Sequence, residues 1–170
     1  MNKKVRFITQ AAIIAATYAV LTLLTLQFSS YAIQVRVAES LCVLICYTPA
    51  AIPGMFVGCL ISNIFSGTLA DIIFGSLATL VAGLITAKIP KKQKKLFPIP
   101  TVVVNTVVVP FILYYGYGIT SMGNAKGTVA TLLLMAGTVC IGEVIACFFI
   151  GLPLIKILDR IWPIIGKDNE

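Results

Sequence analysis

The sequence predicts an all-α integral membrane protein, a compact bundle whose chain crosses the bilayer six times with both termini inside (N-in/C-in). Of the 170 residues, 59% are hydrophobic and only 11% are charged, whereas a soluble domain is about 45–50% apolar and about 25% charged. A chain of this size has too little interior to hide so much apolar surface from water. Its charged residues are separated by long charge-free stretches, which are typical of membrane spans.

Hydropathy and helix breakers define the predicted spans. A helix rises about 1.5 Å per residue, so about 20 residues cross a hydrocarbon core of about 30 Å. Pro49, Pro53 and Gly54 divide one apolar stretch into two short spans, which must be tilted or packed against protein. Gly151 and Pro153 predict a kink in the last span. The spans of this single membrane domain (1–170) are 7–26, 38–47, 51–65, 69–87, 98–115 and 128–157.

The distribution of lysine and arginine predicts the orientation. Thirteen bases and six acids give a net charge of +7. With six spans and the N-terminus inside, only Arg36 and Lys126 lie outside, which agrees with the excess of bases in inner loops of membrane proteins. The basic loop 88–95 is therefore interpreted as a topology anchor near anionic lipid, and no nucleic-acid partner is expected. The first apolar segment is interpreted as a retained helix, because it is too long for a signal peptide.

The residues that are absent exclude several kinds of chemistry. The sequence has no histidine, which removes histidine-dependent nucleophilic catalysis and most zinc and haem sites. It has no P-loop motif for ATP hydrolysis. The five cysteines form no C-x-x-C pair and lie in apolar runs, where they are expected to be buried packing residues. We therefore expect no cofactor, no metal and no enzymatic activity.

Two polar residues are predicted near the middle of the membrane. A charged side chain at the bilayer centre costs about 2.5–3.5 kcal/mol on insertion scales, so it needs a reason to be there. Glu143 lies midway along the sixth span on a face of small residues, which leaves room for a ligand or a helix. Asn105 lies at a similar depth in the fifth span. Both are candidate ligand-binding residues, and the alternative for each is a hydrogen bond between helices.

Other candidates lie closer to the predicted outer surface. Asn63 shares a helix face with Phe56 in the third span. Arg36 and Glu39 have the i, i+3 spacing of an ion pair, and each is either a ligand contact or part of an interfacial pair. Asp71 is interpreted as a helix N-terminal carboxylate without a further role. The tyrosines of the outer boundary are interface anchors, or stack on a planar ligand: Tyr31, Tyr114, Tyr115 and Tyr117.

Small residues mark two helix faces where another helix can approach closely. Gly54 and Gly58 form a G-x-x-x-G motif, for which packing inside the bundle is an adequate explanation. The first span carries an alanine stripe that favours docking of a partner protein. The stripe consists of Ala11, Ala12, Ala15 and Ala16.

Taken in order, five segments resemble the QueT family of membrane transport proteins, over nearly the whole chain. The segments are QVRVAESL (34–41), TPAAIPGMFVGCLISN (48–63), DIIFGSLATL (71–80), VVVNTVVVP (102–110) and GEVIACFFIGLPL (142–154). Each segment is apolar and weakly specific, but their order and spacing are characteristic.

The resemblance implies a six-helix substrate-binding (S) component of an energy-coupling-factor (ECF) transporter in a bacterial plasma membrane. It implies a queuosine precursor, a small 7-deazaguanine, as the ligand, and a coupling membrane protein and two ATPase subunits as partners. The alanine stripe occupies the position that such components use against the coupling protein. The expected ligand contacts are Glu143, Asn105, Glu39, Arg36, Asn63, Phe56, Tyr31 and Tyr115.

Three alternatives stay open. The first is another vitamin or nucleobase-like ligand in an equivalent pocket. The second is a membrane enzyme built on Glu143 and Glu39, and the third is a structural subunit without a ligand. The sequence leaves open which precursor is preferred and which residue contacts which edge of it.

Overall fold

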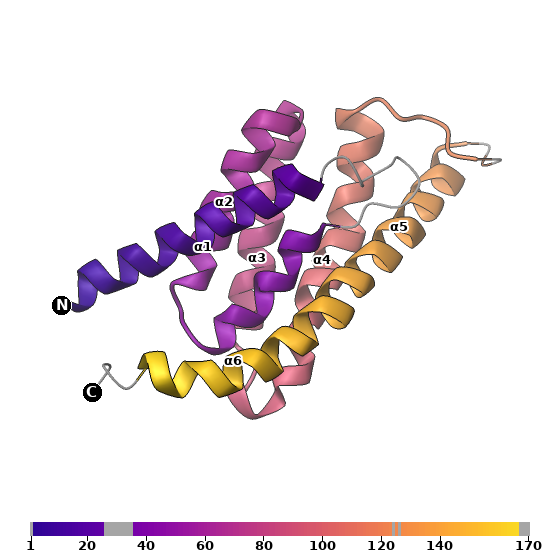
Figure 1. Cartoon of the computed structure of the whole chain (residues 1–170). Helices are drawn as coiled ribbons and strands as arrows, with labels where there is room; N and C mark the ends of the chain where they lie inside the picture. The colour runs from indigo at the N-terminus through magenta and orange to yellow at the C-terminus, as the bar shows by residue number, and fades with distance from the viewer. Residues whose placement is uncertain (1, 26–35, 124, 126, 167–170) are drawn as a thin grey trace.

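All regular elements of the described residues are helices, which confirms the predicted all-α class (Figure 1). The structure is a computed structural model and describes residues 2–25, 36–123, 125 and 127–166. The α-helices are α1 (Lys3–Thr25), α2 (Ala51–Ser66), α3 (Ser76–Thr86), α4 (Pro98–Phe111), α5 (Thr128–Val144) and α6 (Gly151–Gly166). Two 3-10 helices are η2 (Val37–Cys46) and η4 (Lys91–Leu96), and three π-helical segments are η3 (Asp71–Gly75), η5 (Ile112–Gly116) and η6 (Ile145–Ile150).

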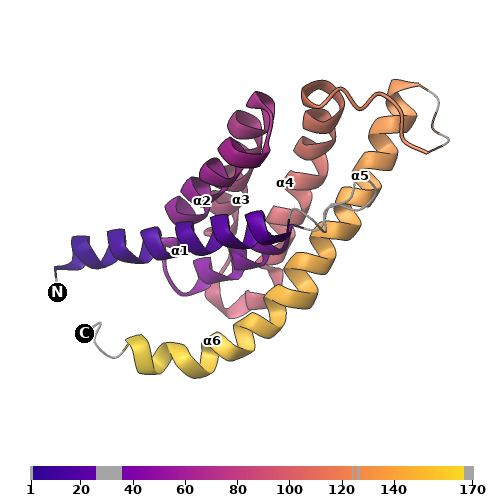
Figure 2. The ribbon, with the colours of Figure 1, turned by 45° about the horizontal axis from the view of Figure 1, so that its top comes forward.

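The helical runs follow the predicted spans closely. Three runs in the described part of the chain are long and apolar enough to cross a membrane: Lys3–Thr25, Lys91–Gly116 and Thr128–Pro163. The remaining three are shorter apolar helices, Val37–Cys46, Ala51–Phe65 and Asp71–Thr86. The six crossings and their orientation therefore stay a prediction. Figures 1 and 2 show the last run bending between α5 and α6, where Gly151 is the first residue of α6.

The short helix η2 lies at the centre of the bundle. It contacts α1, α2, α3, α4, η6 and α6, and eight of its ten residues are buried. A helix that is apolar on all sides is stable when protein surrounds it. Its 3-10 geometry gives about 2.0 Å per residue, so these ten residues reach further than the same number in an α-helix. The predicted short span is thus a core helix that places Glu39 in the interior.

Helices α1 and α2 pack closely along the G-x-x-x-G motif. A Cβ atom built on Gly58 would lie 2.6 Å from the Ala15 carbonyl oxygen and 2.7 Å from Tyr18 Cβ. A Cβ atom on Gly54 would lie 2.8 Å from the Ala11 carbonyl oxygen. Only glycine permits this approach, and the interface explains the motif as packing within the chain. It also fixes the position of Tyr18, which is 1% exposed.

At the lysine-rich end of the bundle, α6 is held against η2 and η4. Asp159 forms an ion pair with Lys94 and accepts a hydrogen bond of 2.7 Å from the Tyr47 hydroxyl. Lys94 and Tyr47 hold the pKa of the Asp159 carboxyl below its usual range. The Tyr47 ring packs against Trp162, with ring centroids 5.3 Å apart. These contacts fasten the end of the bundle that carries loop 88–95.

Candidate ligand-binding site

Two residues predicted from separate spans meet in the interior. The Asn105 side-chain amide on α4 donates a hydrogen bond of 2.9 Å to Glu143 Oε1 on α5. The two side chains are 2% and 1% exposed. On the other side of the carboxyl group, the Cys147 thiol lies 3.6 Å from Oε2. The amide and the carboxyl group together offer a donor and several acceptors within an otherwise apolar bundle.

Glu39 brings a second carboxyl group from η2 into the same region. Its side chain is fully buried, and Oε1 accepts hydrogen bonds from the Tyr18 hydroxyl at 2.5 Å and the Thr79 hydroxyl at 3.4 Å. Its other oxygen, Oε2, is buried without a hydrogen-bond partner. Glu39 lies near Asn105 and interacts electrostatically with Glu143. A buried acceptor without a donor costs about 1–3 kcal/mol, so Oε2 is an unsatisfied acceptor in the interior.

Asp71 connects four segments at the opposite end of the bundle from loop 88–95. Both of its oxygens lie 3.2 Å from the Arg36 guanidinium, and Oδ2 also accepts a 3.1 Å hydrogen bond from the Tyr117 hydroxyl. The Asn63 amide donates to the Asp71 backbone carbonyl at 3.0 Å. We call these four residues the Asp71 clasp. It joins η2, α2, η3 and the end of η5.

The clasp corrects two sequence interpretations. Arg36 forms its ion pair with Asp71 and not with Glu39, three residues further along η2. Asp71 does lie in the first turn of its helix, but it also has a further role, because it is 4% exposed and binds the side chains of Arg36, Tyr117 and Asn63. The reason is tertiary: the π-helical turn η3 places Asp71 over the start of η2, so the guanidinium reaches a carboxylate from another segment.

Carboxyl groups outnumber basic side chains in this interior. Among the described residues, the connected cluster has three carboxyl groups but a single basic side chain, Arg36, which Asp71 binds directly. Glu39 and Glu143 have no positively charged hydrogen-bond partner there. Two buried carboxyl groups without a cation favour a ligand that supplies hydrogen-bond donors or a positive charge.

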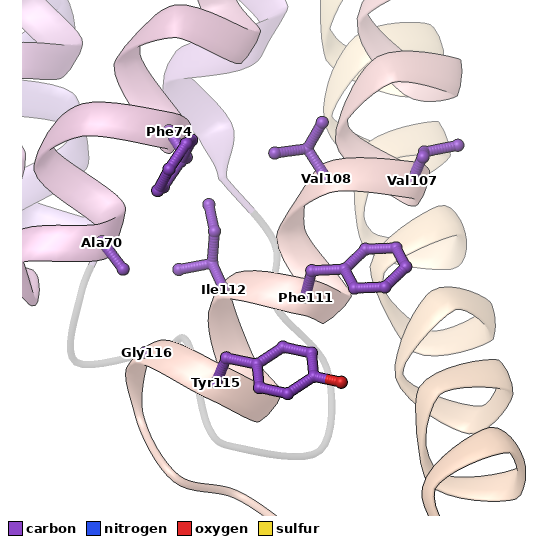
Figure 3. A pocket seen from close by; sticks show the side chains of 8 residues that line it. All are labelled: Ala70, Phe74, Val107, Val108, Phe111, Ile112, Tyr115 and Gly116. Atoms are coloured by element: carbon purple, nitrogen blue, oxygen red, sulfur yellow. The ribbon is translucent and has the colours of Figure 1, made fainter.

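Of the remaining predicted contacts, Phe56 is half-buried and Tyr115 is exposed. Phe56 is half-buried on α2 and belongs to neither buried apolar cluster of the described residues. Tyr115 is 71% exposed and lines an apolar groove of about 350 Å³ between η3 and the α4–η5 run (Figure 3). Phe111 stacks on its ring, with centroids 6.5 Å apart. Tyr31 lies outside the described residues.

The structure divides the alanine stripe of α1 between two faces. Ala15 is 5% exposed and packs on Gly58 of α2, and Ala11 is half-buried beside Gly54. Ala12 and Ala16 are exposed. Part of the stripe is thus occupied within the chain, and only the exposed part is free to meet a partner.

Tyr18 and Thr79 contact the cluster but are absent from the sequence prediction. Both hydroxyls lie within hydrogen-bond distance of Glu39, and the Thr79 hydroxyl, which has one hydrogen to donate, also lies 3.3 Å from the Gly75 carbonyl oxygen and 3.4 Å from Cys59 Sγ. The Asn63 amide lies 3.5 Å from the same sulfur, which links the clasp to Glu39. One signal was available: Tyr18 is a polar aromatic residue in the middle of a span, away from the interfaces where tyrosines usually anchor.

Comparison with known proteins agrees with the resemblance seen in the sequence. A family model described as QueT transporter matches residues 8–160. Searches of curated proteins and of solved structures returned no match. The matched region includes every residue of the polar cluster, and the long apolar helices are those of a membrane protein. The chain is a membrane protein that belongs to the QueT transporter family, a family of transport proteins and not of enzymes.

Proposed function

We propose that the protein is the substrate-binding component of an ECF-type importer in a bacterial plasma membrane. It captures a queuosine precursor of the 7-deazaguanine type from outside and delivers it inward when docked on a coupling membrane protein with two ATPase subunits. The observation that carries the proposal is the pair of buried carboxyl groups of Glu39 and Glu143, with Asn105 between them and one Glu39 oxygen unpartnered.

The chemistry of a 7-deazaguanine supports this assignment. Its guanine-like edge presents two adjacent N–H donors, which a carboxylate can accept in bidentate fashion. We assign that edge to Glu143 and the ligand carbonyl to the neighbouring Asn105 amide. An aminomethyl substituent adds a cation, which we assign to the free oxygen of Glu39. A cationic ligand would also supply the positively charged partner that Glu39 and Glu143 lack among the described residues.

The proposed orientation places loop 88–95 inside and the Asp71 clasp outside. Eleven of the thirteen bases then lie on the inner side. A ligand from outside reaches Glu39 past the clasp, because Arg36 lies at the start of the same short helix.

Titration calorimetry of the purified protein tests the function. We expect 7-aminomethyl-7-deazaguanine to bind about tenfold to a hundredfold more tightly than 7-deazaguanine, since a hydrogen bond to a charged group contributes about 1.5–3 kcal/mol. Mass spectrometry of co-purified small molecules provides an independent readout. Binding of an unrelated vitamin, or of no ligand at all, would contradict the proposed substrate, and the second result would favour a structural subunit.

The exposed alanines of α1 provide a test of partner docking. Ala16→Leu is expected to reduce cellular uptake several-fold while the purified protein keeps its ligand affinity, because the added side chain blocks approach of a partner helix. Ala15→Leu is the matched comparison, since it overfills the contact with Gly58 and should impair both binding and uptake. Full uptake by the Ala16 variant would exclude this face as the docking surface.

A further inference from the structure

The two oxygens of Glu39 have different environments. Oε1 accepts hydrogen bonds from Tyr18 and Thr79, which come from different helices, whereas the buried Oε2 has no partner. A carboxyl group held through one oxygen cannot turn freely about its terminal bond, because rotation would break both hydrogen bonds. The hydroxyls therefore determine which oxygen is left open.

The stronger of these two contacts comes from α1. The Tyr18 hydroxyl lies 2.5 Å from Oε1, against 3.4 Å for the Thr79 hydroxyl. The position of Tyr18 is fixed by the glycine contact with α2, since its Cβ atom lies against Gly58. Its ring is 1% exposed and packs in the main apolar cluster with Cys59. A rigidly packed ring thus ends in the hydroxyl that orients the carboxyl group.

Helix α1 consequently has two distinct faces. Tyr18 and Ala15 point inward, towards Glu39 and α2. Ala12, Ala16 and Ile13 are exposed, and Ile13 is 61% exposed. Figures 1 and 2 show α1 at the margin of the bundle, alongside α2. The helix that offers a docking face therefore also contacts the carboxyl group at the proposed site.

We propose that Tyr18 is a positioning residue of the ligand site: by binding Oε1 of Glu39, it directs Oε2 towards the cationic group of the ligand. This inference rests on the proposed function and adds α1 to the structures that determine ligand selectivity. Tyr18 acts through Glu39 and does not itself contact the ligand.

Tyr18→Phe removes the hydroxyl and keeps the packed ring. We expect the affinity for 7-aminomethyl-7-deazaguanine to fall about tenfold, and that for 7-deazaguanine to fall less than about threefold, because only the first ligand has the cation. In a protein that already carries Glu39→Gln, Tyr18→Phe should lower the ligand affinity little further, since the two residues act as one unit. Calorimetric titration of all four proteins with both compounds measures the selectivity and the coupling.

Tyr114→Phe is the matched control, because the Tyr114 hydroxyl binds Thr128 outside the cluster, at 2.9 Å. It should leave both affinities unchanged. Thr79→Val removes the second donor to Oε1 and should shift selectivity in the same direction, whereas Thr79→Ser should retain it. These variants keep the test decisive if Tyr18→Phe folds poorly.

The outcomes separate this inference from the function on which it rests. If Tyr18→Phe lowers the affinity for both compounds equally, or if the effects of Tyr18→Phe and Glu39→Gln on affinity are additive, Tyr18 is only a packing residue. The proposed function would still stand. If the wild-type protein binds neither compound, the proposed function and the positioning role both fail.

Discussion

Glu143→Gln is expected to lower the affinity for a 7-deazaguanine by about tenfold to a few hundredfold. The substitution replaces one acceptor oxygen with an amide donor, which would face either the ligand N–H groups or the Asn105 amide. Hydrogen bonds to charged groups contribute about 1.5–3 kcal/mol, and a mismatched buried donor adds a further cost. At about 1.4 kcal/mol per decade these terms give the expected range.

Calorimetric titration of the purified variant measures this loss. Membrane insertion should not suffer, because a neutral amide is no harder to bury than a carboxylate. Thr131→Val is a useful control, since Thr131 is also fully buried on α5 but hydrogen-bonds backbone carbonyls away from the cluster. Wild-type affinity in a well-folded Glu143 variant would leave this carboxyl group with a structural role only.

Asp71→Ala is expected to give the largest loss of stability. The substitution removes the carboxylate that binds both Arg36 and Tyr117. The Arg36 side chain, which is 18% exposed, then has lost its ion-pair partner. Breaking a buried pair in this way costs about 3–5 kcal/mol, and the partial exposure of Arg36 places the effect near the lower limit. For a chain of this length, about 3 kcal/mol corresponds to a Tm about 6–12 °C lower.

Thermal unfolding in detergent at one fixed scan rate measures the change. Asp159→Ala provides the comparison, because it breaks the ion pair with Lys94 at the other end of the bundle, where the side chains are 34% and 45% exposed. An exposed pair contributes about 0.2–1 kcal/mol, so its Tm should fall much less. Equal shifts in the two variants would show that the clasp is no more than a surface ion pair.

Local sequence features predicted the helical segments well. Pro49 correctly indicated a break before α2, which begins at Ala51, whereas Pro53 and Gly54 lie inside the first turn of α2, where a proline is tolerated. The predicted fifth segment, 98–115, corresponds to α4 and η5, which end at Gly116. Proline geometry and hydropathy act over a few residues, so the chain reveals these boundaries without any knowledge of its neighbours. The π-helical segments were not predicted, since their hydrogen-bond register depends on packing.

Part of the candidate site was also accessible from the sequence. Glu143 and Asn105 stand out in the sequence because a polar group deep in an apolar span needs a partner, and a hydrogen bond of 2.9 Å joins their side chains. Sequence spacing gave the wrong partner for Arg36, because i, i+3 spacing suggested Glu39 and the actual partner, Asp71, is 35 residues away. Sequence periodicity also could not show which alanines of the stripe are buried and which are exposed. It identifies the residues that share a helix face, but not the helix that packs against that face.

By itself, the sequence determined the all-α class, the helical segments and the two polar residues deep in apolar spans, Glu143 and Asn105, that need a partner there. Those properties follow from composition, hydropathy and short-range backbone chemistry. The tertiary structure decided that the Tyr18 hydroxyl binds Glu39, that Asp71 forms an ion pair with Arg36, and that Ala15 is covered while Ala16 is exposed. Each of these depends on how closely two helices approach, which is set by the combined shape of many side chains distant in the sequence.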